Sequence, residues 1–129
     1  MARRRILLGS GLNADKLTET IRQMGLKDTL ICDVPGEEHG WAHLRAHEEG
    51  WLLTTGYPSD EGPDPLLATR GIVLPEESQI TGWRAGVYVA IRLPAGVGPR
   101  DLAGLIEACI RLLHGMASDS AVQISLEQG

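Results

Sequence analysis

The sequence of 129 residues predicts a single α+β domain, in which a mostly antiparallel sheet carries two helices on one face. Short apolar runs alternate with two amphipathic stretches, and glycine or proline clusters separate them. The expected order is β-α-β, a hairpin, a loop, one strand and a second β-α-β. The two outer units form a ferredoxin-like β-α-β…β-α-β frame. Between them we expect an inserted β-hairpin at residues 37–56 and an acidic loop at residues 57–69.

The first β-α-β unit begins with an apolar run at residues 4–8, which is long enough for a strand. A helix is expected after Asn13, a favourable N-cap, and Gly25 suits the position just after its end. The next strand spans Thr29–Val34 and stops at a proline. The helical stripe that would face the core consists of Leu17, Ile21 and Met24.

Three of the four histidines stand four residues apart, and the local conformation decides what they can do. As a helix, residues 39–47 would scatter their apolar side chains and would contain Gly40, which costs about 1 kcal/mol relative to alanine. As a strand, the segment alternates strictly between small or aliphatic residues on one face and histidine, tryptophan or arginine on the other. After the loop Glu48-Glu49-Gly50, Trp51–Thr55 is the return strand. We therefore expect a hairpin strand with one face made of His39, Trp41, His43, Arg45 and His47.

The chain after the hairpin begins with a loop that is rich in proline and acids. Residues 66–68 are expected to form one helical turn, and Gly71–Leu74 a short strand that ends at a proline. Residues 76–83 are expected to be irregular. Strict alternation over Ala85–Leu93 predicts the strongest strand of the chain.

The second β-α-β unit contains the most secure helix. Pro99 suits its first turn, and Gly115 can end it. The last strand is Val122–Leu126, which alternates again. The core stripe of this helix consists of Leu102, Leu105, Ile106, Cys109, Leu112, Leu113 and Met116.

The net charge of −5 is concentrated in the middle of the chain. Residues 28–64 hold nine acids against one base, giving −8, while the other segments hold eight acids and eleven bases, giving +3. This balance disfavours nucleic acid as a partner of the middle third. The apolar run after the N-terminal arginines is too short for a signal peptide or a membrane span. We therefore expect a cytoplasmic protein that does not associate with membranes.

A metal site is one interpretation of the histidines. Zinc is held by imidazole nitrogens about 2 Å from the ion, and nickel accepts the same ligands, so the rings must converge. Residues four apart on a strand are separated by roughly 13 Å, so His39, His43 and His47 cannot share one ion within the strand. One of them could still combine with His114 or with a histidine of a second subunit. Two other interpretations remain open: a solvated sheet face, and a pH-responsive face in which neighbouring glutamates favour the charged imidazole.

A nucleotide site is the second candidate. The segment Gly9–Ala14 matches the G-x-G-x-x-G/A pattern between an expected strand and an expected helix. In this interpretation, Gly9 and Gly11 let a pyrophosphate approach the helix N-terminus, and Asp33, at the end of the next strand, binds a ribose. A dinucleotide fold, however, needs several helices over a parallel sheet, and only one convincing helix follows residue 36. A tight turn from strand to helix explains the same glycines.

Catalysis has no signature in the sequence that would identify a reaction. Neither G-x-S-x-G nor H-E-x-x-H occurs. Cys32 and Cys109 lie in apolar surroundings, where a thiol is usually buried and inert. His114 is more simply a residue that compensates a helix dipole. Whether the protein is an enzyme therefore stays open.

The aromatic residues of the hairpin favour a binding surface. Some of them must serve the core of a chain without phenylalanine, but Trp41 and Trp51 could form an exposed platform. A sheet with helices on one face leaves its second face to solvent or to another subunit, so a homodimer is a further expectation.

The function that we expect is that of a non-catalytic binding or regulatory module for a protein partner or a small ligand. The alternatives are a metal-binding protein or metalloenzyme, and a nucleotide-binding domain. The expected contact residues are Trp41, His43, Arg45, His47, Trp51 and Tyr57.

Overall fold

The computed structural model describes residues 4–11, 13–113 and 122–129. Over these residues the chain folds into a seven-stranded antiparallel sheet and three α-helices. This confirms a mixed α/β fold with an antiparallel sheet. The elements are β1 (Arg4–Ser10), α1 (Ala14–Gln23), β2 (Thr29–Asp33), β3 (Trp41–His47), β4 (Gly50–Gly56), α2 (Pro63–Thr69), β5 (Gln79–Arg84), β6 (Tyr88–Pro94), α3 (Pro99–Ala108), the π-helical turn η1 (Cys109–Leu113) and β7 (Gln123–Gln128).

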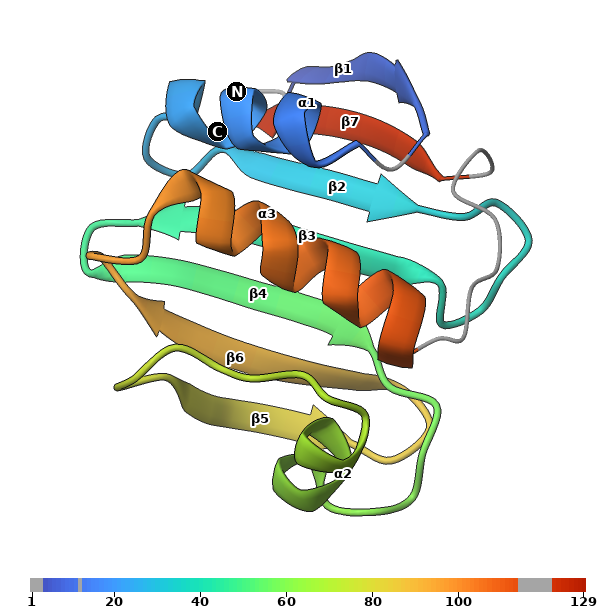
Figure 1. Ribbon diagram of the computed structural model, residues 1–129. Coiled ribbons are helices and arrows are strands. Elements are labelled where there is room, and N and C mark those ends of the chain that lie inside the picture. Colours follow the sequence, from blue (N-terminus) through green and yellow to red (C-terminus); the bar gives the residue numbers. More distant parts are fainter. Residues whose placement is uncertain (1–3, 12, 114–121) are drawn as a thin grey trace.

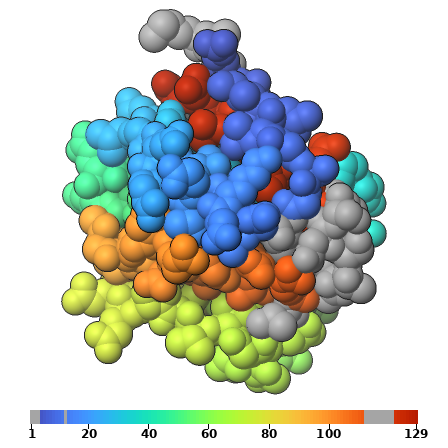
Figure 2. Space-filling model, turned by 45° about the horizontal axis from the view of Figure 1, so that its top comes forward, coloured from blue at the N-terminus to red at the C-terminus, as the bar shows by residue number. Residues whose placement is uncertain are grey.

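The strands lie in the order β1-β7-β2-β3-β4-β6-β5, and each neighbouring pair is antiparallel. Helices α1 and α3 cross one face of the sheet, and α2 lies near its β5 edge (Figure 1). In the space-filling view, α1 packs against α3, and the segment around α2 continues the same surface (Figure 2). The ferredoxin-like frame with two helices is not confirmed. There is a third helix, and three strands, β2, β3 and β4, lie between β6 and β7.

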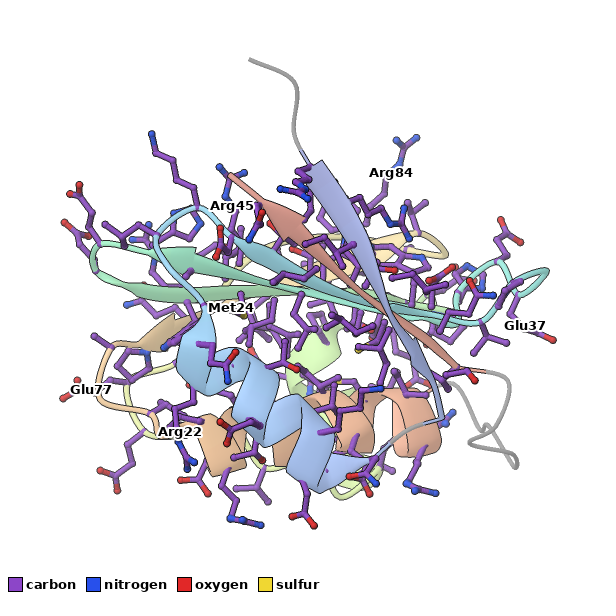
Figure 3. All side chains as sticks on the ribbon, turned by 90° about the horizontal axis from the view of Figure 1, so that it is seen from above. Arg22, Met24, Glu37, Arg45, Glu77 and Arg84 are labelled. Atoms are coloured by element: carbon purple, nitrogen blue, oxygen red, sulfur yellow. The ribbon has the colours of Figure 1, made fainter. Side chains whose placement is uncertain are left out.

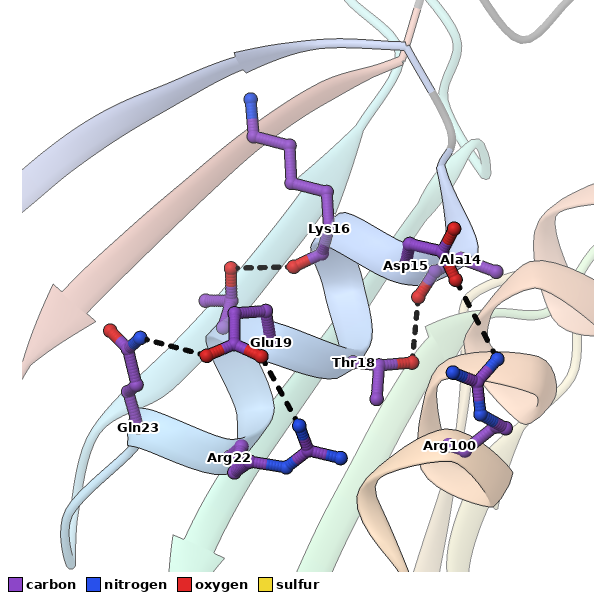
Figure 4. A network of polar contacts seen from close by, with 9 residues as sticks. Ala14, Asp15, Lys16, Thr18, Glu19, Arg22, Gln23 and Arg100 are labelled. Atoms are coloured by element: carbon purple, nitrogen blue, oxygen red, sulfur yellow. Dashed lines mark hydrogen bonds and ion pairs between the residues drawn. The ribbon is translucent and has the colours of Figure 1, made fainter.

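Helix α1 begins and ends close to its expected positions. The Asn13 side chain caps it by accepting a hydrogen bond from the amide of Lys16 at 3.0 Å. Its buried stripe includes Leu17, which packs into the common core. Asp15 and Arg100 form an ion pair of 3.6 Å that joins α1 to α3 (Figure 4). Because both of these side chains are well exposed, the pair adds little stability.

The hairpin of β3 and β4 is confirmed, with the strand assignment that the alternation favoured. Ala42, Leu44 and Ala46 of β3 are buried, whereas their neighbours along the strand are at least partly exposed. Gly50 begins β4 with a φ of +147°, and a Cβ there would collide with the carbonyl of Leu93. Glycine is therefore required where the hairpin turns against β6.

The segment between β4 and β6 departs most from expectation. The expected acidic loop contains the seven-residue helix α2, which is longer than the single turn expected. Gly71–Leu74 is not a strand: Gly71 has a φ of +79° just after α2, and Val73 is 86% exposed. Residues 79–84, expected to be irregular, form the edge strand β5. Strand β6 starts at Tyr88 rather than at residue 85, because a turn around Gly86 precedes it.

The core fills the space between the sheet and the helices. Leu53 of β4, Ile91 of β6 and Leu102 of α3 are buried together with the α1 stripe and with Leu67 of α2. Helix α3 follows its expected start at Pro99 and passes into the π-helical turn at residue 109. The expected helix end at Gly115, and the histidine before it, lie outside the described residues.

Candidate functional site

One face of the sheet carries no helix among the described residues, and we call it the open face. In the view along the sheet, Arg45 and Arg84 point away from the helices, on the opposite side from α1 and α3 (Figure 3). The strand registers assign the rest of the face, because side chains of paired residues lie on the same side of a sheet. The open face includes Arg5, Leu7, Thr29, Ile31, Asp33, Trp41, His43, Arg45, His47, Leu52, Thr54, Gln79, Arg84, Tyr88, Ala90, Arg92, Gln123, Ser125 and Glu127.

Strand β3 supplies the middle of this face. Its register places Trp41 beside Asp33 of β2, and His43 beside Ile31 of β2 and Thr54 of β4. The rings of Trp41 and His43 are tilted against each other, with 4.9 Å between their centroids. The same alternation that buries the alanines of β3 therefore presents two rings and a guanidinium on the open face.

A depression of about 650 Å³ lies over β1, β7, β2 and β3 and reaches Thr54 of β4. Arg5 connects its sides, with its Nη2 atom 3.9 Å from Asp33 Oδ1 and 3.5 Å from the hydroxyl of Ser125. Positive and negative side chains and the rings of Trp41 and His43 therefore line the same depression. Its lining residues are Arg5, Ile31, Asp33, Val34, Pro35, Gly36, Glu37, Trp41, His43, Thr54 and Glu127.

The imidazole of His43 is half-buried in this depression. Burial lowers its pKa below the ordinary value of 6.5, because the charged form loses hydration. Asp33 and Glu127 act in the opposite direction and raise the pKa, while Arg5 lowers it further. The neutral imidazole is therefore favoured near neutral pH, contrary to the expectation that nearby glutamates would favour the charged form.

The open face also contains buried polar atoms that lack a hydrogen-bond partner within the described residues. Asp33 Oδ1 and Arg45 Nε are buried and make no hydrogen bond within the described part of the chain. Over the same residues, no acid lies within ion-pair distance of Arg45, Arg84 or Arg92. Three arginines of the open face therefore have no acid within ion-pair distance in the part of the chain that the structure describes.

The structure places the three histidines at separate points. His39 precedes β3, and its Nε2 atom lies 2.6 Å from the carbonyl of Gly86. His43 lies in the middle of the open face, and His47 ends the strand beside a second, smaller depression of about 280 Å³. Within residues 4–11, 13–113 and 122–129, no three His, Cys, Asp or Glu residues are close enough to hold a metal ion. The suggested additional ligand, His114, lies outside these residues.

Gly56 explains how His39 reaches the turn before β6. The backbone of His39 lies so close to Gly56 that a Cβ at position 56 would overlap it. Only glycine allows the segment before β3 to approach the end of β4 in this way. The hydrogen bond of Thr55 Oγ1 to the carbonyl of Trp41, at 2.8 Å, fixes the same junction.

Trp51 and Tyr57 do not join Trp41 on one platform. The register pairs Trp51 with Leu93 on the helix-covered side of the sheet, where it packs against the core. Tyr57 is fully buried, donates a hydrogen bond to the carbonyl of Glu61 and contacts Trp83 edge to face. The two hairpin tryptophans therefore lie on opposite faces of the sheet. Trp51 pairs with Ala46, which is on the covered face, whereas Trp41 is on the open face of β3.

The glycine-rich segment and Asp33 do not form a dinucleotide site of the expected kind. Strand β7 lies between β1 and β2, and both neighbours are antiparallel to it. Gly9 lies beside Lys16, whose Nζ donates a 2.6 Å hydrogen bond to the carbonyl of Leu8. The amide of Gly11 donates to the carbonyl of residue 122 at 2.8 Å. Asp33 lies on the open face, whereas this segment leads to α1 on the covered face.

Both cysteines are buried on the helix-covered side. Burial raises the pKa of the Cys32 thiol to about 12, and neighbouring Asp33 adds to the rise. Burial alone raises the pKa of Cys109 to about 12. Neither thiol is therefore an available nucleophile at neutral pH.

Four charged residues of the open face were not expected from the sequence. Arg92 stands between Ile91 and Leu93 in β6, a signal that could have assigned it to a polar face. Arg5 and Glu127 have an apolar neighbour on one side only, Ile6 in β1 and Leu126 in β7. Arg84 belongs to the edge strand that was missed. Which strands lie next to each other, and hence which charges meet, required the sheet order.

No protein-family model matches the chain, and no curated protein and no solved structure is significantly similar to it. In the described part of the chain, no helix has the length and apolar character needed to cross a membrane.

Proposed function

We propose that this protein is a small, non-catalytic binding or regulatory module and that the open face of its sheet is the contact surface. The observation that carries the proposal is the open face itself. It combines the Trp41–His43 ring pair with three arginines that lack ion-pair partners among the described residues. Aromatic and arginine side chains are the types that dominate binding energy at protein interfaces.

Two further observations are consistent with this proposal. Both thiols are buried on the covered side of the sheet, with their pKa raised to about 12. His43 is half-buried, with a lowered pKa, in a hollow lined by five strands, so a group bound there would be partly removed from water. A contact surface of this kind fits a protein partner or a small ligand.

Affinity capture from extracts of the native host tests the proposal. The bait is the full chain, and the test variant is Trp41→Ala combined with His43→Ala. We expect a protein that the wild type retains and this variant loses, and that binds the bait again after its own purification. The matched control is Val73→Ala, since Val73 is 86% exposed beside α3, on the helix side.

Retention of the same partner by the double variant, or loss in the Val73→Ala control, would place the contact surface elsewhere. For a small ligand, amide chemical shifts give the same comparison. Ligand-induced changes should concentrate on β2, β3 and β7 and should spare α1.

A further inference from the structure

We infer that the occupant of the open face is a second copy of this chain, so that two sheets pack face to face about a two-fold axis along β3. This inference rests on the proposed function, because it names the partner of the same surface. Three observations carry it: the separation of charge across the open face, the register that aligns the opposite charges, and the area of the face.

The open face is divided into two halves of opposite charge. On the side of β2 and β7 it carries Asp33 and Glu127, with Glu37 in the adjoining loop, against Arg5. On the side of β4, β6 and β5 the strands carry Arg84 and Arg92 and no acid, while Glu49 and Glu77 of the adjoining loops border the same depression as Arg92. A surface with this distribution is complementary to a copy of itself that is turned by half a rotation.

The register specifies which residues would meet. Strand β3 is the fourth of seven in the sheet order, so a two-fold axis along it overlays the two faces completely. It places β7 over the partner's β6 and β2 over the partner's β4. Glu127, Arg45 and Arg92 lie on one line across the sheet, through Thr29 and Leu52. Glu127 of each copy therefore faces the partner's Arg92, which forms two equivalent ion pairs.

The size of the face fits a modest dimer. Seven strands spaced by about 4.8 Å span roughly 29 Å, and their length of about six residues spans roughly 20 Å. Each copy would bury roughly 600 Å², and the pair roughly 1,200 Å², at the lower end of the range for specific interfaces. We therefore expect a dimer that dissociates on dilution and weakens with added salt.

Arg45 distinguishes a second copy from any acidic partner. It lies on β3, so the axis would bring the two Arg45 side chains close together, and like charges there oppose pairing. Replacing Arg45 with leucine should therefore tighten the dimer. An acidic peptide or another anion on the same face would instead be held by Arg45, and the same substitution would weaken its binding.

Sedimentation velocity over a concentration series, with the full chain, tests the inference. Wild type should associate to a dimer, and Arg92→Glu should weaken its association at least about tenfold. The swap Arg92→Glu with Glu127→Arg should restore it, and Arg45→Leu should strengthen it. The matched control is Arg22→Glu, which makes the same charge change on an exposed site of α1.

A cross-linking measurement decides the matter if a charge variant fails to fold. Sheets that pack face to face lie about 10 Å apart, so a bis-maleimide of that span should join two chains of His43→Cys. The same reagent should leave Gln23→Cys on α1 monomeric. The native thiols do not interfere, because both are buried and have their pKa raised to about 12.

A monomer at all concentrations up to about 1 mM, with no cross-link through residue 43, would overturn the inference. A dimer that is indifferent to Arg92→Glu would overturn it as well. If a monomeric wild type bound a polyglutamate peptide and lost it in Arg45→Leu, an acidic partner would take the place of the second copy. In each of these cases, a host protein released by the Trp41 and His43 substitutions would leave the proposed function standing.

Discussion

The two faces of the sheet differ in burial and in the residues they carry, and the seven residues of strand β3 show both kinds of face. Its covered face is small and apolar, with Ala42, Leu44 and Ala46 buried under α3 and its continuation. Its open face carries Trp41, His43 and Arg45, which no described helix covers. Packing determines the first face and leaves the second free to carry charge. Substitutions on the two faces should therefore differ in kind as well as in size.

The largest difference should come from truncating neighbouring leucines of β4. Leu53 is fully buried against the helices, whereas Leu52 lies on the open face and is partly exposed. Leu53→Ala should lower the free energy of unfolding by about 2–5 kcal/mol, because it leaves a cavity in the core. Leu52→Ala should cost less than about 1 kcal/mol. Urea unfolding of both variants, at a dilution where the chain is monomeric, measures the contrast, and equal losses would mean that part of the same chain covers the open face.

Thiol reactivity gives a second contrast between the faces. Cys32 lies on the covered face, and its pKa of about 12 suppresses the thiolate roughly a thousandfold relative to the ordinary value of 9.0. An aromatic disulfide reagent should therefore leave both native thiols unmodified in the folded protein. A cysteine introduced by Thr54→Cys on the open face should react readily. Rapid labelling of the wild type before unfolding would show that the core opens locally.

The pH dependence of stability should be traceable to His43. Its pKa is lowered in the folded state, so the unfolded chain binds the proton more readily once the pH falls below about 6.5. Stability should be greatest above that pH, should decrease as the pH falls through it, and should level off below the lowered pKa. His43→Gln should flatten this part of the profile, and His47→Gln at the exposed end of β3 serves as the control.

Nuclear magnetic resonance titration should separate the groups around His43. Removing the carboxylate with Asp33→Asn should lower the pKa of His43 further, because Asp33 raises it. Arg5→Gln should shift that pKa upward, since the guanidinium disfavours a second positive charge. Shifts in the reverse directions would mean that the imidazole faces other groups.

The smallest effect should come from adding metal to the monomer. His39, His43 and His47 lie at separate points of the hairpin, and no metal-binding group is found among the described residues. Calorimetry with zinc or nickel at micromolar protein should detect no tight binding by one chain. A tight site that disappears in His43→Ala would show that imidazoles from two chains or from residue 114 converge.

The sequence predicted those parts of the fold in which local alternation and packing agree. The hairpin, α1 and the start of α3 belong to this class, because each buries one regular stripe of apolar residues. It failed at β5, an edge strand with a bulge between Ile80 and Gly82 that interrupts the alternation. The expected strand at Gly71–Leu74 failed for the opposite reason, because apolar residues after a helix end resemble a strand without having a partner.

The candidate site was predicted only where it is local. The alternation of β3 correctly grouped Trp41, His43 and Arg45 on one face. Trp51 was misplaced, because a shift of one residue in register moves a side chain to the other face. The other charged residues on the row of Arg45 are Glu127 of β7 and Arg92 of β6, which are far from it in the chain. Only the order of the strands shows that they lie on one line.

The insertion of β7 between β1 and β2 has a consequence for the assembly of the protein on the ribosome. The first two strands are synthesised early, but no hydrogen-bonded ladder can join them until residues 123–128 have emerged, as the pairing of Arg4 with Gln128 illustrates. Contacts with such large sequence separation are costly to close and slow to form. This corner of the sheet should complete after translation, and its amides should be the last to gain protection from hydrogen exchange.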